Sequence, residues 1–422
     1  MSPIFINYRS FKKELFFFLF LYITLIISFF LGENSTGGAI GDYINQKIAT
    51  GAFALDFFKT LNEYDNYGHR HSPVLIIILS FFEKIKLPDI LIRLIHLHLC
   101  LVLPFLFYKC LTIKFSKIDK KVFFFLSSLI FISPTFRSLA IWPDSRLLGL
   151  ILFTLSVYYF LKFEESNNFK FAILNVVTLA LSSYISPNFS VFSIFFFTKF
   201  ILNYGIFSKK IIFLVFINLI LAFPAFYYLF ILDVNFLFKT TAAVGIAENE
   251  KTIFYNLFND ILITFSIIFF YLIPFLFFKI IKIDNVLHFK NILISISIFL
   301  VCFINFNYNY FYSGGGIFFK FSNFFFDNNN LFYLISFFAI LTISPLILKN
   351  YLNVLLIIII ILNNPQYTIY HKYFDPFLLI AFFTIFSFKI DLNKIFHSKN
   401  YLFIFTYFLV FLFMSNFKLF YV

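Results

Sequence analysis

Long apolar runs recur along the whole chain and are separated by short polar stretches. The first run, Leu15 to Leu31, is long enough to cross a bilayer, whose hydrocarbon core takes about 17–25 helical residues. Such runs along an entire chain are typical of a polytopic all-α membrane protein. We therefore expect one integral membrane domain over residues 1–422, with about 13 spans (12–14) and no separate soluble domain. The later spans are expected at about 90–108, 122–133, 147–162, 171–185, 190–204, 211–231, 261–279, 291–304, 331–348, 351–362, 376–389 and 401–416.

The charged residues give these spans an orientation. Arg9, Lys12 and Lys13 precede the first run, so the positive-inside rule places the N-terminus in the cytoplasm. Roughly 20 of the 33 Lys and Arg then fall on the cytoplasmic side, and roughly 14 of the 20 Asp and Glu fall outside. We expect a multi-pass protein of the cell (inner or plasma) membrane whose C-terminus is extracytoplasmic. No small-residue cleavage pattern follows the first run, which we expect to be retained as a helix.

Composition supports the same class of protein. The chain is 61% hydrophobic and only 13% charged, with a mean hydropathy of +0.92, whereas soluble domains carry about 25% charged residues. The net charge is +13, but the basic residues are sorted by membrane side. We therefore expect a lipid bilayer, and no nucleic acid, among the partners. The cysteines, Cys100, Cys110 and Cys302, follow no metal or disulfide spacing.

The first extracytoplasmic loop, residues 33–89, is the most polar passage of the chain. Within it, apolar residues recur at spacings of three, four and seven, with Gly51 as the expected break. That spacing predicts one or two amphipathic helices on the membrane surface. A short apolar run, 74–86, predicts a further helix in the outer interface. The recurring apolar residues are Ile44, Ile48, Leu55, Phe58 and Leu61.

Two groups in this loop could carry chemistry. Asp42 lies about ten residues beyond the first span, where an Asp can act as a general base on a lipid-linked substrate. A helix N-cap or a solvated loop residue is the alternative. His69, Arg70 and His71 could contact phosphate or substrate, form a plain interfacial loop, or contribute to a metal site. We assign no metal ligands and no cofactor, although a divalent cation is compatible with the sequence.

Two later outer loops add further candidates. Asp144 lies between Arg137 and Arg146 and beside Trp142, as a second acidic group facing Asp42, a phosphate clamp, or an ordinary ion pair with an interfacial anchor. A cluster before the predicted span at 376–389 could hold a phosphate and pack on a sugar or an isoprene, or could simply lie at the interface. Its members are Gln366, Tyr370, His371, Lys372, Tyr373 and Asp375.

At these positions the chain resembles the GT-C membrane glycosyltransferases, and in particular the protein O-mannosyltransferases and the lipid A aminoarabinose transferases. The likeness covers residues 1–165, with hydrophobic architecture alone beyond them. A cytoplasmic N-terminus and one span lead into a large outer loop. An Asp lies early in that loop, a His opens the next apolar run, and a further acid lies in the second outer loop. The residues are Gly41-Asp42-Tyr43, His71-Ser72-Pro73 and Asp144 after Ser133-Pro134.

The resemblance implies sugar transfer from a polyprenyl-phosphate donor to a glycan, lipid or protein acceptor on the outer face, as in cell-envelope glycosylation. Asp42 would deprotonate the acceptor, and Asp144 would orient the acceptor or a base partner. The leaving phosphate needs positive charge, for which the candidates are Arg137, Arg146, His371 and Lys372.

Other classes stay open at this point. A polysaccharide polymerase or ligase would centre on a large late outer loop rich in Arg, and here the early loop is the polar one. A transporter or lipid-linked glycan flippase would carry polar groups along its spans, whereas here the charges lie in the loops. An accessory subunit without chemistry would use the same clusters as interface anchors.

Overall fold

The computed structural model describes residues 8–68, 71–234, 256–284, 286–309, 314–363 and 368–417, without the side chains of 8–13 and 15. These residues form helices joined by short turns, and no β-strand occurs among them, so the prediction of an all-α fold is confirmed. The α-helices are α1 (Tyr8–Leu31), α2 (Ala39–Leu55), α3 (Phe57–Asn62), α4 (Pro73–Lys84), α5 (Asp89–Cys100), α6 (Val102–Lys114), α7 (Lys120–Ser128), α8 (Pro134–Ile141), α9 (Ser145–Ser166), α10 (Phe169–Ile185), α11 (Ser193–Tyr204), α12 (Lys209–Phe226), α14 (Leu257–Phe277), α15 (Phe289–Ile304), α16 (Gly316–Phe326), α17 (Asn330–Leu348), α18 (Tyr351–Leu362), α19 (Phe377–Thr384) and α20 (Asn400–Phe417).

Many of these helices have the apolar composition of membrane spans. Six are long and apolar enough to cross a bilayer, and a bent pair would make a seventh. Four shorter apolar helices lie beside them, and the prediction of about 13 spans stays a prediction. The six are Asp89–Lys114, Ser145–Ser166, Lys209–Ile231, Leu257–Phe277, Asn330–Leu348 and His397–Phe417.

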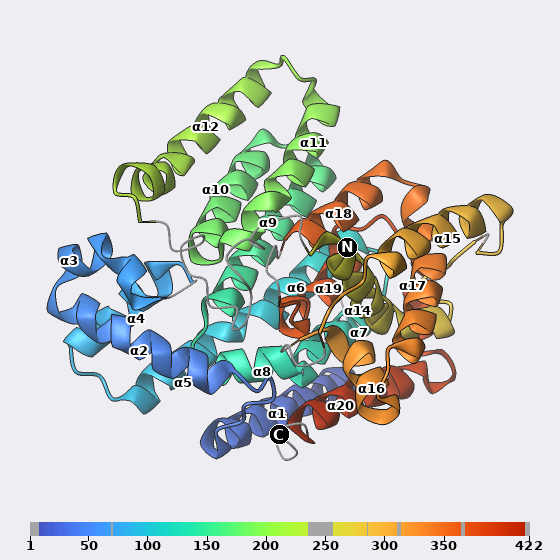
Figure 1. The fold of residues 1–422 in the computed structure, drawn as a ribbon, viewed down its shortest axis with the longest axis horizontal. Helices are drawn as coiled ribbons and strands as arrows, with labels where there is room; N and C mark the ends of the chain where they lie inside the picture. The colour runs from blue at the N-terminus through green and yellow to red at the C-terminus, as the bar shows by residue number, and fades with distance from the viewer. Residues whose placement is uncertain are drawn as a thin grey trace.

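The helices pack into a bundle in which the first and last described helices lie side by side. Figure 1 shows α1 beside α20, and the rings of Phe17 and Phe405 from these helices lie 5.7 Å apart. Aromatic side chains fill the interior, as where Phe153 of α9 stacks on Phe189 at 4.8 Å. Outward-facing residues of α12 are mostly apolar and exposed, which suits a helix surrounded by lipid.

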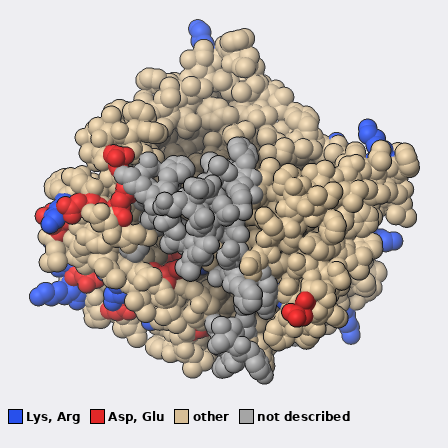
Figure 2. All heavy atoms as spheres, viewed as in Figure 1, with Lys and Arg blue, Asp and Glu red and all other residues tan. Residues whose placement is uncertain are grey.

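Residues 33–89, predicted as the first outer loop, form the amphipathic helices that their spacing predicts. Ile44, Ile48, Leu55 and Phe58 are exposed, while the opposite face of α2 is buried against α4. The expected break at Gly51 is wrong, because α2 runs through that residue. The helix ends instead at Asp56, whose carboxylate accepts a hydrogen bond from the amide of Lys59 and caps α3. In Figures 1 and 2, charged side chains gather on the side where α2 to α5 lie.

The second outer loop differs from its prediction. Residues from Pro134 onward form the buried helix α8, bent by 63° from the helix that precedes it. Ser133 caps α8 with its hydroxyl and Pro134 occupies the first turn, so the chain must start a new helix there. Ser133 and Pro134 thereby turn the expected loop into a buried helix, which packs against α5.

Two later stretches also differ from the sequence reading. The apolar run at 376–389 forms only the short, wholly buried helix α19. A lysine hydrogen-bonds to backbone carbonyls at the C-terminal end of this helix. The Lys114 ammonium donates to the backbone oxygens of Thr384 and Phe386, at 2.7 Å each. Residues 316–326, expected as part of a loop, form α16.

Candidate active site

Four charged side chains from three distant parts of the chain meet around Arg146. Its Nη2 lies 2.8 Å from Oδ2 of Asp144 and 3.0 Å from Oδ2 of Asp42. The Lys372 ammonium lies 3.2 Å from the same Asp42 oxygen. Asp42, Asp144, Arg146 and Lys372, which the sequence proposes as site residues, are therefore brought together, and we call them the ion-pair cluster.

Local structure fixes each member of the ion-pair cluster. Asp42 lies in the first turn of α2, where the helix dipole favours a negative charge. Asp144 is the N-cap of α9, and its Oδ1 accepts hydrogen bonds from the backbone amide of Arg146 at 2.7 Å and from its Nε at 3.0 Å. Lys372 lies in the 3-10 turn His371–Tyr373 that leads towards α19.

The members differ in exposure. The Asp144 side chain is 2% exposed and those of Arg146 and Lys372 are 13% exposed, whereas Asp42 is 34% exposed. Burial raises the pKa of the Asp144 carboxyl, but the Arg146 guanidinium outweighs burial and holds that pKa well below its usual range. Burial and the neighbouring Arg146 lower the pKa of the Lys372 ammonium. Asp42 is thus the member most accessible from outside.

Two tyrosines face the cations. The guanidinium of Arg146 lies 5.2 Å from the ring centre of Tyr373, and the ammonium of Lys372 lies 4.9 Å from that of Tyr370. At these distances each ring face stabilises its cation. Burial raises the pKa of Tyr373 to about 12, so its hydroxyl stays protonated at neutral pH. Tyr370, a predicted site residue, thus borders the cluster through Lys372.

His71 lies next to the ion-pair cluster in a neutral form. Its Nδ1 lies 3.1 Å from the hydroxyl of Ser145, the residue between Asp144 and Arg146. Burial lowers the pKa of His71 to about 4, so the ring carries no charge at neutral pH. Its place beside the cluster agrees with the sequence reading, and it offers hydrogen bonding in place of positive charge. His69 and Arg70 lie outside the described residues.

Two other predicted phosphate ligands point elsewhere. The Arg137 guanidinium pairs with Glu33 at 2.8 Å, and none of its hydrogen bonds goes to the ion-pair cluster. The His371 ring packs against Phe270 and Phe411, with its Nε2 3.1 Å from the hydroxyl of Tyr271. The structure therefore separates Arg137 and His371 from Lys372 and Arg146.

Asp375 supports the turn that carries Lys372. Its buried carboxylate accepts hydrogen bonds from the hydroxyl of Ser133 at 2.6 Å and from the amide of Thr135 at 3.0 Å, at the start of α8. The turn is thereby tied to a helix from a distant part of the chain. The sequence places Asp375 in the same polar run as Lys372 but gives no sign of this partner.

Within the described ranges, no group of three or more His, Cys, Asp or Glu side chains is arranged to hold a metal ion. No protein-family model matches the chain, nor does any curated protein or solved structure. Inferences about function therefore rest on the residues themselves.

Proposed function

We propose that the chain is a GT-C membrane glycosyltransferase that moves a sugar from a polyprenyl-phosphate donor to a glycan, lipid or protein acceptor on the extracytoplasmic face. One observation carries the proposal. Two nearly buried cations, Arg146 and Lys372, converge on one oxygen of the exposed Asp42 carboxylate. A carboxylate that can act as a base and two cations that can bind a phosphate are thus in direct contact at the end of a predicted span.

The roles of the residues follow from their positions. Asp42 takes the proton of the acceptor hydroxyl or amine as that group attacks the sugar. Arg146 and Lys372 stabilise the phosphate that leaves, which needs positive charge more than it needs a proton. Asp144 holds the guanidinium of Arg146 in place through two hydrogen bonds, at 3.0 and 2.8 Å.

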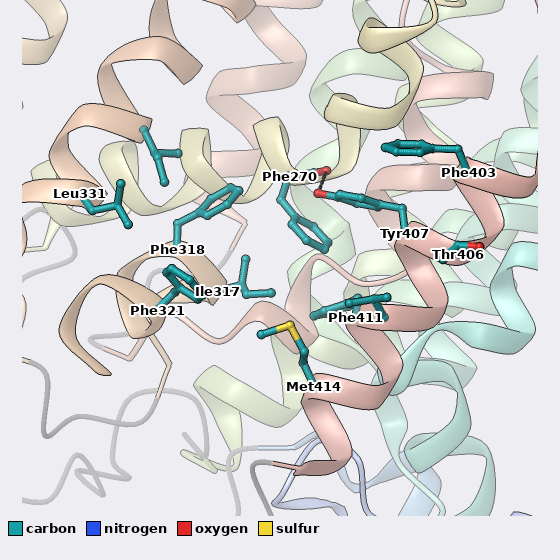
Figure 3. A pocket seen from close by; sticks show the side chains of 12 residues that line it. Phe270, Ile317, Phe318, Phe321, Leu331, Phe403, Thr406, Tyr407, Phe411 and Met414 are labelled. Carbon is teal, nitrogen blue, oxygen red and sulfur yellow. Dashed lines mark hydrogen bonds between the residues drawn. The ribbon is translucent and has the colours of Figure 1, made fainter. Parts of the chain in front are cut away.

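An apolar pocket supports a lipid-linked donor. It encloses about 440 Å³ between α14, α16, α17 and α20, and Figure 3 shows its phenylalanine walls. Two of its lining residues, Phe270 and Phe411, also contact the ring of His371, the residue before Lys372. A hydrocarbon chain in this pocket would therefore end near the turn that carries Lys372.

The donor class can be tested with purified protein in detergent. We expect release of polyprenyl phosphate from at least one member of a panel of polyprenyl-phosphate sugars when glycan, lipid and peptide acceptors are supplied. We assign Arg146 and Lys372 to a single phosphate group. A nucleotide sugar, which carries a diphosphate, should therefore give no transfer. Turnover of a soluble nucleotide sugar by the pure protein would contradict the proposal.

A further inference from the structure

The Asp42 carboxylate occupies the position that an anionic ligand would take. Its Oδ2 is the acceptor for both Arg146 Nη2, at 3.0 Å, and Lys372 Nζ, at 3.2 Å. Among the described residues, Lys372 makes no other ion pair. A phosphate oxygen that binds these same two nitrogens would take the place of this carboxylate oxygen.

The charges of the cluster balance. Asp42 and Asp144 carry two negative charges, Arg146 and Lys372 carry two positive charges, and His71 is neutral because burial lowers its pKa to about 4. As it stands, the cluster has no excess positive charge with which to attract a phosphate. Binding becomes favourable only when one of the carboxylates gives way.

Of the two carboxylates, only Asp42 is placed so that a ligand could displace it. Asp144 is 2% exposed, caps α9 and accepts three hydrogen bonds from Arg146, whereas Asp42 is 34% exposed and its carboxylate is held only by the two cations. Gly38, one turn before Asp42, lies beside both members of this pair. A Cβ at Gly38 would lie 3.5 Å from the Lys372 ammonium and 3.9 Å from the Asp42 carboxylate.

We propose that Asp42 is both the base and an internal occupant of the phosphate site. The donor phosphate displaces the Asp42 carboxylate from Arg146 and Lys372, and the freed carboxylate then faces the acceptor. This inference rests on the proposed function, and it orders the reaction: the donor must bind before the base is released. Without donor, Asp42 stays paired and the acceptor is not deprotonated.

The same exchange accompanies the chemical step. The acceptor O–H or N–H bond breaks and its proton goes to Asp42, while the acceptor atom forms a bond to the sugar carbon. The bond from that carbon to the phosphate oxygen breaks, and its electron pair leaves with the phosphate. The phosphate thus gains one negative charge as Asp42 loses one, so the total charge of the site is unchanged and both cations remain with the phosphate.

Product release follows from the reverse exchange. Once Asp42 has passed its proton to solvent, its carboxylate can again pair with Arg146 and Lys372 and compete with polyprenyl phosphate. A variant without this carboxylate should therefore bind the product more tightly, although it is inactive.

The test measures the affinity of the purified protein for farnesyl phosphate, a short polyprenyl phosphate, by calorimetry in detergent. We expect Asp42→Asn to bind it about twofold to fivefold more tightly than the wild type, the range expected when a competing, partly exposed ion pair is lost. Asp42→Glu retains a carboxylate and should keep an affinity close to that of the wild type. Lys372→Met should bind more weakly.

Asp89→Asn is the matched control. Asp89, at the start of α5, accepts hydrogen bonds from Lys47 of α2 at 2.8 Å and from Tyr43 at 2.6 Å, and none of these residues belongs to the ion-pair cluster, so its substitution should leave the affinity unchanged. If the wild type transfers sugar but Asp42→Asn binds farnesyl phosphate no more tightly than the wild type does, this inference is wrong while the proposed function stands. If neither form binds farnesyl phosphate and the wild type releases none from any donor, the proposed function fails with it.

Discussion

Two arginines close together in the sequence, Arg137 and Arg146, each pair with carboxylates. The two groups differ in how deeply those carboxylates are buried. Arg137 and Glu33 are 6% and 10% exposed, and the guanidinium also donates to backbone oxygens of Thr24 and Phe131. Arg146 is also nearly buried, but one of its two carboxylate partners, Asp42, is 34% exposed. The first pair has no partner that a ligand could replace, whereas the second pair has one.

This difference separates a structural role from a reactive one. A buried charge must be fully paired within the protein, because leaving it without a partner costs several kcal/mol. Arg137 meets that need through α1 and the loop after it, and thereby fastens α8 to α1. Arg146 pairs with both Asp144 and Asp42, and its three hydrogen bonds to the buried Asp144 would keep it paired if a ligand displaced Asp42.

The largest effect on stability is expected where the pair is closed. Arg137→Met leaves Glu33 buried without a cation, and we expect the free energy of unfolding to fall by about 3–5 kcal/mol. Thermal unfolding in detergent measures this loss. The double variant Glu33→Gln/Arg137→Met should regain much of it, because neither charge is then left alone. A single variant as stable as the wild type would contradict the structural role of this pair.

Substitutions that break the pairing of Asp42 should lower the activity and hardly change the stability. Lys372→Met removes one of the two cations assigned to the leaving phosphate, and we expect transfer to slow about tenfold to a hundredfold. Its unfolding temperature should change little, because the partner Asp42 can turn to water. Lys47→Met, which breaks the exposed pair with Asp89, should change neither quantity. Equal losses of activity in both variants would remove the distinction.

A smaller effect is expected for His71 and depends on pH. Because burial lowers the pKa of the folded protein's His71 to about 4, below the ordinary value of 6.5, the unfolded state binds the extra proton first. Stability is complete above pH 6.5 and falls as the pH drops from 6.5 towards 4, by about 1–3 kcal/mol. Comparing thermal unfolding of the wild type and His71→Gln over this range isolates the effect. Parallel curves for the two proteins would show that His71 is not buried neutral.

The sequence predicted the class of the fold because hydrophobic run length is a local property. It also placed Asp42, Asp144, Arg146 and Lys372 in three separate polar loops, with Asp144 and Arg146 in the same one, and the structure brings all four together. The amphipathic spacing of Ile44, Ile48 and Leu55 was likewise enough to predict a surface helix.

What the sequence could not give depends on contacts between distant residues. Arg137 and Arg146 look alike as neighbours of Asp144, and only the position of Glu33 shows that Arg137 is already paired. His371 and Lys372 are adjacent, yet one packs among phenylalanines and the other meets Asp42. Local cues were also missed: the Ser133–Pro134 pair starts a helix where a loop was expected, and Gly51 does not end one.

The most direct test of the account compares release of polyprenyl phosphate by the wild type, Asp42→Asn and Asp89→Asn, with the same donor and acceptor in detergent. If Asp42 is the base, Asp42→Asn should lose at least about a hundredfold in rate while its unfolding temperature stays close to that of the wild type. Asp89→Asn should keep full activity. Release by Asp42→Asn at the wild-type rate would contradict the central claim, since the exposed carboxylate of the ion-pair cluster would then play no part in the reaction.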